Sequence, residues 1–302
     1  MFYNNKELFE QIILRVSDES GIEAGIIEKD YYVTLFLKCI VKRQPDIIFK
    51  GGTSLSKCYK LIQRFSEDID LSLNAKEKPT EGQRRQLKES IVSIIDGFGF
   101  TLTNSDTIKS RRDYNKYIID YPSVFDSSYL KQHLIVETSV YISAYPYHRL
   151  KASSLIYDYL YKNGFTDIIE QYDLSPFELN VQSADRTLID KVCAIGDYYL
   201  SGKITEHSRH IYDIYKLIEV VNLNDELKLL TKEVLSERKK HKTCLSAQEN
   251  VDLKKMLYEI IEKDIYKSDY ETITSALLFE KVDYADAIGA VYKIIERGIF
   301  DE

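Results

Sequence analysis

Two aspartates in the segment DIDLSL (residues 68–73) have the spacing of a metal-binding pair. In a β-strand, alternate side chains face opposite sides, so Asp68 and Asp70 share one face and the apolar residues between them share the other. Two carboxylates side by side repel each other unless a cation lies between them. The pattern predicts a divalent-metal site on a strand that packs its other face on the core. A pair of solvated acids on a surface strand or turn remains the alternative.

A glycine-rich turn stands upstream of this pair. Gly51, Gly52, Thr53 and Ser54 follow the apolar run 47–49 and come directly before a helical pattern. Such a turn exposes backbone N–H groups at the positive end of a helix, where a phosphate binds well. The same residues also suit a tight turn with a hydroxyl N-cap, and the two roles are compatible. A phosphate-binding turn followed by metal-binding carboxylates is what nucleotidyl transfer needs.

Glu137 is the candidate third carboxylate. It lies in the strand pattern 132–142, on the same face as Ile135 and Ser139. Two divalent metals about 3.5–4 Å apart need three carboxylates, so Glu137 qualifies if its strand lies beside the Asp68/Asp70 strand. Otherwise it is a glutamate at a strand edge that faces water.

Lys191 and Asp213 lie in the C-terminal half, both in segments with helical periodicity. Lys191 borders the apolar face of its helix, where a lysine usually extends to water or pairs with an acid. It could instead contact a triphosphate across a cleft. Asp213 stands four residues after Arg209, so an ion pair within one helix would explain both residues.

The composition is that of an ordinary globular protein. The chain has 302 residues, enough for about two domains, with 44% hydrophobic and 29% charged residues. The net charge of −7 argues against wholesale coating of nucleic acid, although it allows a local basic groove. The clusters 109–112 (KSRR) and 238–242 (RKKHK) are candidate phosphate contacts, or simply solvated faces.

Targeting and redox signals are few. No apolar run reaches the roughly 18–20 residues that span a bilayer, and the N-terminus lacks the pattern of a signal peptide, so we expect a cytoplasmic protein without a membrane contact. The 4 cysteines are scattered without a CxxC pair, which favours free thiols over a zinc site or disulfides.

Hydrophobic periodicity predicts an α+β N-terminal half and a helical C-terminal half, divided as residues 1–182 and 183–302. The expected strands are 47–49, 68–73, 101–103, 115–121, 132–142 and 177–181. The expected helices of the first half are 5–20, 28–42, 83–98 and 153–162, with one more from the glycine turn to Gln63. The expected helices of the second half are 185–200, 206–221, 224–238, 252–263, 267–278 and 283–297.

Three blocks of the chain resemble the AbiEii/AbiGii toxin family of the nucleotidyltransferase superfamily. FKGGTSLSK followed by RFSEDIDLSL resembles the signature of the family, and IIEKDYYVT resembles its entry helix. LIDKVCAIGDYYLSG and SRHIYDIYKL resemble its helical motifs. The matches lie between residues 27 and 217 in the order found in the family.

The resemblance implies a polymerase-β-like catalytic domain, a mixed sheet with flanking helices, and a helical domain that completes the cleft. It implies roles for residues of the motifs: the glycine turn (Gly51, Gly52, and Thr53 or Ser54) holds the triphosphate, Asp68 and Asp70 bind Mg²⁺, Lys191 contacts the nucleotide phosphates and Asp213 supports the site. The superfamily turn is often Gly-Ser, so which hydroxyl acts here stays open. Glu137 as a third metal ligand rests on strand placement.

The implied function is a Mg²⁺-dependent nucleotidyltransferase that acts as the toxin of a toxin–antitoxin or abortive phage infection pair. The partner would be a separate antitoxin, typically a winged-helix repressor. We expect an NTP as the substrate and an RNA, such as the 3′ end of a tRNA, as the acceptor, with a protein side chain as second choice. The alternatives are a non-catalytic nucleotide- or RNA-binding protein of the same fold, and a phosphate-ester hydrolase.

Overall fold

The computed structural model describes residues 1–66, 68–73, 79–125 and 133–301. The chain forms two compact units. The first comprises Met1–Tyr59 and Ser66–Val181, and the second comprises Lys60–Phe65 and Gln182–Glu302. The short segment between the glycine-turn helix and the Asp68/Asp70 strand thus belongs to the second unit, so the units are not contiguous in sequence.

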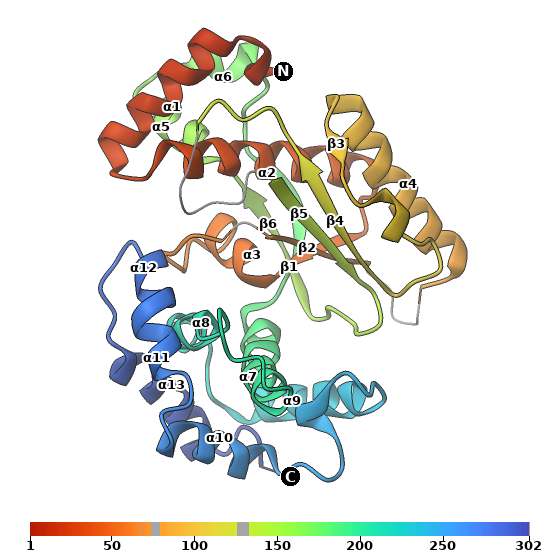
Figure 1. The fold of residues 1–302 in the computed structure, drawn as a ribbon, viewed down its shortest axis with the longest axis vertical. Helices are drawn as coiled ribbons and strands as arrows, with labels where there is room; N and C mark the ends of the chain where they lie inside the picture. The colour runs from red at the N-terminus through yellow and green to blue at the C-terminus, as the bar shows by residue number, and fades with distance from the viewer. Residues whose placement is uncertain (67, 74–78, 126–132, 302) are drawn as a thin grey trace. The chain divides into compact units, whose positions relative to one another are not determined.

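The first unit is built on a mixed seven-stranded sheet with the strand order β3-β4-β5-β2-β1-β7-β6 (Figure 1). Strand β2 is central: it runs parallel to β5 on one side and antiparallel to β1 on the other, and β1 runs parallel to β7. The strands are β1 (Ile47–Lys50), β2 (Asp68–Leu73), β3 (Thr101–Leu102), β4 (Tyr114–Asp120), β5 (His133–Ser139), β6 (Tyr147–Ala152) and β7 (Phe177–Gln182). The expected α+β class is confirmed.

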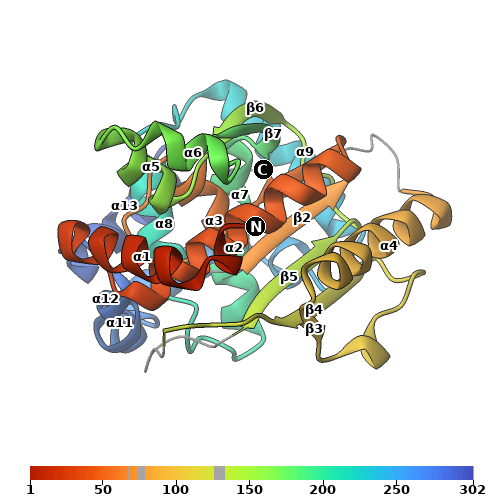
Figure 2. The same ribbon diagram turned by 90° about the horizontal axis from the view of Figure 1, so that it is seen from above.

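Helices α1, α2 and α4 lie on one face of this sheet (Figure 2). Ile69 and Leu71 of β2 are fully buried in the core beneath them, while Asp68 and Asp70 are half-buried on the opposite face. The alternation read from the sequence therefore holds in the sheet. The helices of this unit are α1 (Lys6–Ser20), α2 (Ala24–Arg43), α3 (Gly51–Lys57), α4 (Glu81–Phe98), α5 (Leu155–Lys162) and α6 (Thr166–Gln171).

In the described part of the first unit, α3, β6 and α6 differ from the sequence prediction. Helix α3 ends at Lys57 rather than near Gln63. Lys60, just beyond it, has a positive φ of 54°, which is incompatible with a right-handed α-helix. Strand β6 was not predicted because it is an edge strand with mostly exposed side chains, so it carries no apolar run. The short helix α6 was also missed, since it has a single fully buried residue, Ile169.

The second unit is helical, as predicted. Helix α8 packs against both α7 and α13, and side-chain caps from Ser183, Asn224 and Asp252 start α7, α9 and α10. The helices are α7 (Ala184–Leu200), α8 (Arg209–Leu217), α9 (Asp225–Lys239), α10 (Leu253–Glu262), α11 (Lys267–Asp269), α12 (Ser275–Leu277) and α13 (Tyr284–Glu296). A π-helix at Tyr270–Thr274 separates α11 from α12, so the expected helix 267–278 is broken.

Neither a membrane-spanning helix nor a disulfide is expected from the sequence. None of the helices in the described residues combines the length and the apolar character needed to cross a membrane. The four cysteines all lie in the described part of the chain and form no disulfide there, and Cys193 and Cys244 are buried.

Candidate active site

The sheet places four charged residues in one row across neighbouring strands. Glu137 of β5 lies directly opposite Asp70 of β2, and Lys50 of β1 lies opposite Asp70 on its other side. Lys116 of β4 lies opposite Glu137. Because β5 is an inner strand between β2 and β4, the interpretation of Glu137 as a strand-edge residue is wrong. The strand pairing required for a third carboxylate is present.

A lysine flanks the two acids at each end of this row, which partly offsets the repulsion between the acids. The Nζ of Lys116 lies 3.1 Å from Oε1 of Glu137. Tyr114, also on β4, is affected by both acids. Burial raises the pKa of its phenol most, the charge of Glu137 and the hydrogen bond to it raise the pKa further, and the charge of Asp70 adds to the shift. The negative charges of Asp70 and Glu137 therefore act on a common region of this face.

Asp70 also lies against the backbone of the glycine turn. Gly51, the first residue of α3, has a φ of +78°, and a Cβ atom placed on it would lie only 2.0 Å from Oδ2 of Asp70. Both the left-handed backbone and the contact disfavour any residue with a side chain at this position. The glycine thus lets a metal-binding candidate and the start of a helix approach each other closely.

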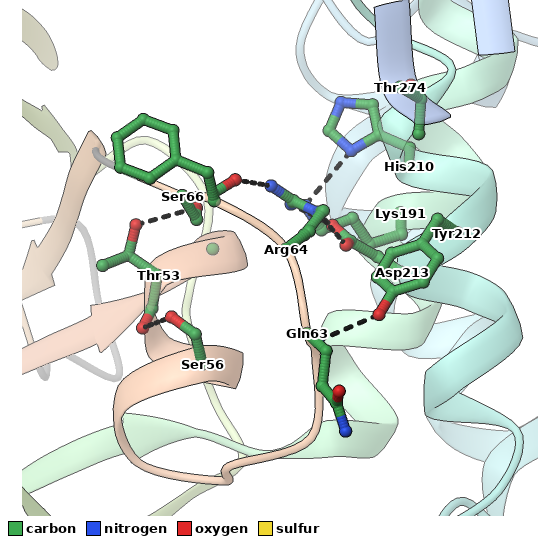
Figure 3. A network of polar contacts seen from close by, with 12 residues as sticks. Thr53, Ser56, Gln63, Arg64, Ser66, Lys191, His210, Tyr212, Asp213 and Thr274 are labelled. Carbon is green, nitrogen blue, oxygen red and sulfur yellow. Dashed lines mark hydrogen bonds and ion pairs between the residues drawn. The ribbon is translucent and has the colours of Figure 1, made fainter. Parts of the chain in front are cut away.

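The two hydroxyls of the turn are engaged inside the protein, and Figure 3 shows the contact of Thr53 with Ser66. Ser54 is fully buried and donates to the carbonyl of Gly51 at 2.8 Å. The Oγ1 of Thr53 lies 2.9 Å from Oγ of Ser66, just before β2. These hydroxyls fasten the turn to itself and to the start of the Asp68/Asp70 segment.

A buried lysine and a partly buried aspartate, which the sequence reasoning did not single out, hold α3 in place. Lys57 is 4% exposed, and its Nζ lies 2.5 Å from Oδ1 of Asp30 and 2.6 Å from Oγ1 of Thr34, both on α2. The other oxygen of Asp30 accepts from the backbone N–H of Leu155. Lys57 and Asp30 both lie in sequence blocks that resemble the family. A charged residue at a helix position that faces the core was the signal that could have identified them.

The donor types on this face suit a hard divalent cation such as Mg²⁺, which prefers carboxylate oxygens. Asp68 and Asp70 share the face, and Glu137 stands next to Asp70. Within the described ranges, the side chains as placed form no group of three or more His, Cys, Asp or Glu residues able to hold a metal. The chemistry of the residues fits the metal, with Asp68 and Asp70 as the pair that would hold it.

The second unit buries a three-residue charge cluster around Asp213 of α8 (Figure 3). Asp213 is fully buried, and its Oδ2 lies 2.8 Å from Nζ of Lys191 on α7. Arg64 donates from Nε to Oδ1 at 2.7 Å and from NH2 to Oδ2 at 2.8 Å. The structure brings Lys191 and Asp213 together, as the motifs suggested, and adds Arg64, which no local pattern connects to them.

Charge pairing outweighs desolvation in this cluster. Burial alone would raise the pKa of the Asp213 carboxyl, but the charges of Arg64 and Lys191 hold the pKa well below its usual range. Burial lowers the pKa of Lys191, and the charge of Asp213 opposes that change. Lys191 also lies 3.1 Å from Nδ1 of His210, whose pKa is lowered by burial and by the lysine charge, so the neutral ring accepts the hydrogen bond.

Asp213→Asn is expected to destabilise the helical unit by about 3–5 kcal/mol, because two buried cations lose their anion. Since the folded pKa of Asp213 is depressed, its stabilisation is present above about pH 4 and is lost as the pH falls. Urea unfolding of the wild type and the variant between pH 7 and pH 3 measures both effects.

Asp225→Asn is the matched control, since the Asp225 side chain is 96% exposed and its ion pair with Lys228 is weak. Equal stabilities of the Asp213 and Asp225 variants at pH 7, or a difference that grows with acid, would contradict the expectation.

The two basic clusters have different structural roles. Arg238 is largely buried and pairs with Asp190 at 3.3 Å and Asp197 at 2.6 Å, so as placed it is a structural residue, contrary to the suggested phosphate contact. Lys109 and Arg112 lie in an exposed turn before β4.

Comparisons with known proteins agree with this architecture. The family model described as "Nucleotidyl transferase AbiEii toxin, Type IV TA system" matches residues 36–291. The structure is similar to that of MenT4, a nucleotidyltransferase toxin from Mycobacterium tuberculosis, with a TM-score of 0.65 and 17% identity over 96% of this chain and 90% of that one. At this identity the similarity establishes a shared fold. No curated protein matches the chain significantly. Because the family model covers most of the sequence, the chain belongs to the AbiEii family of nucleotidyltransferase toxins of type IV toxin–antitoxin systems.

Proposed function

We propose that this nucleotidyltransferase uses Mg²⁺, held by Asp68 and Asp70, to transfer a nucleotide from an NTP to the 3′ end of an RNA such as a tRNA. The observation that carries the proposal is the register of β2 and β5, which sets Glu137 directly beside Asp70 on the face that Asp68 shares. Glu137 is the proposed third carboxylate, released from Lys116 when a cation binds.

The protein groups divide the work. The backbone of Gly51 and Gly52 at the start of α3 receives the triphosphate, while the buried hydroxyls of Thr53 and Ser54 keep the turn in shape. A bound divalent ion would supply charge neutralisation and activation of the acceptor hydroxyl. Lys191 neutralises phosphate charge, and Asp213 orients the lysine through their 2.8 Å ion pair.

An RNA acceptor and an antitoxin complete the proposal. The exposed turn with Lys109 and Arg112 supports an RNA partner, because exposed basic side chains meet phosphates without a large desolvation cost. The partner that restrains the toxin is a separate antitoxin of the winged-helix repressor type, encoded beside it. Coexpression of the neighbouring reading frame should restore the growth of cells that express this chain.

Incubation of the purified chain with each labelled NTP, total tRNA and Mg²⁺ tests the function. Label that becomes attached to RNA, and that depends on the metal, is the expected result. Loss of the NTP without labelled RNA would indicate a hydrolase, and Mg²⁺-dependent binding without turnover would indicate a binding protein. Label on protein with none on RNA would replace the acceptor in the proposal.

A further inference from the structure

Arg64 is held in place by the helical unit through its backbone neighbours. The N–H of Phe65 donates to the carbonyl of Leu277 at 3.0 Å, and the carbonyl of Gln63 accepts from Phe279 at 2.8 Å. The N–H of Gln63 donates to the hydroxyl of Tyr212 at 2.9 Å. These contacts make a short antiparallel bridge that fixes the direction of the Arg64 side chain.

The guanidinium group is directed at Asp213 rather than at a substrate. Nε and NH2 bind the two oxygens of Asp213, and NH1 donates to the carbonyl of Phe65 at 2.8 Å. Arg64 is 3% exposed. A bidentate pair of this kind is strong and strictly oriented. This pair gives Arg64 a direct way to act on the charge of Asp213.

The net charge of the Arg64, Lys191 and Asp213 cluster depends on Arg64. Arg64 and Lys191 carry two positive charges against the single negative charge of Asp213, so the cluster retains a net charge of about +1. Arg64 is enclosed, whereas the ammonium of Lys191 has three N–H donors and uses two, on Asp213 and His210. Among the described residues, one donor of Lys191 is left for a further acceptor. Without Arg64, Lys191 and Asp213 would form a neutral pair.

We propose that Arg64 is a positioning residue that neutralises Asp213 and thereby leaves the charge of Lys191 available to the nucleotide triphosphate. The proposal rests on the function proposed for Lys191 and deepens it. Arg64, which precedes the Asp68/Asp70 strand in the sequence, would thus help Lys191 of α7 and Asp213 of α8 to bind the nucleotide. A purely structural role is the competing explanation: it predicts lost stability with unchanged affinity of the folded protein for NTP.

The test compares NTP and inorganic tripolyphosphate affinity, by calorimetry, in Arg64→Gln, Arg64→Lys and the double variant Arg64→Gln/Asp213→Asn. Arg64→Gln should weaken binding of both probes about tenfold, since the charge of Lys191 is then cancelled. Arg64→Lys loses the bidentate geometry but keeps the positive charge, and it should bind within about threefold of the wild type. The double variant removes both charges and should regain part of the affinity lost in Arg64→Gln, although it lacks the ion pair that orients Lys191 and is less stable.

Arg238→Gln is the matched control, because it removes another buried arginine of the same unit that pairs with Asp190 and Asp197. It should lower the unfolding temperature without weakening NTP binding. Unchanged affinity in Arg64→Gln, or a double variant that binds no better than Arg64→Gln, overturns the role of Arg64 alone. A wild-type chain that binds neither probe overturns the proposed function together with it.

Discussion

Asp70→Asn and Asp68→Asn are each expected to reduce nucleotidyl transfer by about a thousandfold, since either change removes a carboxylate from the proposed metal pair. The fold should survive, because both side chains are only half-buried on a face whose opposite side packs on the core. Stability should rise slightly, because one of two repelling charges is lost. Initial rates of labelled NTP incorporation, with circular dichroism to check the fold, measure the effect.

Asp120→Asn is the matched control. Asp120 is an exposed aspartate at the end of β4 in the same sheet, opposite His133 rather than Glu137. It should transfer nucleotide at the wild-type rate. If the Asp70 variant keeps more than about a tenth of the activity, the metal role fails. Recovery of NTP binding at higher Mg²⁺ in Asp68→Asn would instead indicate that Glu137 compensates.

Gly51→Ala is expected to impair both stability and activity. The new methyl group would overlap Oδ2 of Asp70, at 2.0 Å, and the residue would have to keep a φ of +78°. The left-handed backbone alone costs about 1–2 kcal/mol, and the overlap must in addition displace the Asp70 carboxylate. We expect a loss of about 2–4 kcal/mol in stability and at least about a hundredfold in transfer rate. Chemical denaturation and the labelled-NTP assay measure the two losses.

Gly99→Ala separates the two causes. Gly99 ends α4 with a similar φ of +69°, but among the described residues no atom lies within 4 Å of an added Cβ. This variant should lose only the backbone term and keep its activity. If both glycine variants lose the same stability and neither loses activity, then the contact between Gly51 and Asp70 does not position the carboxylate.

The sequence could predict those parts of the site that depend on interactions between residues close together in the chain. The strand alternation of 68–73 and the direct passage from β1 into α3 are local properties, and both hold in the structure. Most helices and strands were also predicted within a few residues, because each has its own period of buried side chains. The roles of Thr53 and Ser54 were less clear, since a capping hydroxyl and a phosphate-binding hydroxyl have the same sequence signal.

By itself, the sequence determined the family, the α+β and helical halves, and the pairing of Asp68 with Asp70 on one face. Only the tertiary structure decided that Glu137 stands beside Asp70 and that Arg64 binds Asp213. It also decided that Arg238 is a buried structural cation. The physical reason is that strand order and buried ion pairs join residues far apart in the chain, which periodicity within one element cannot report.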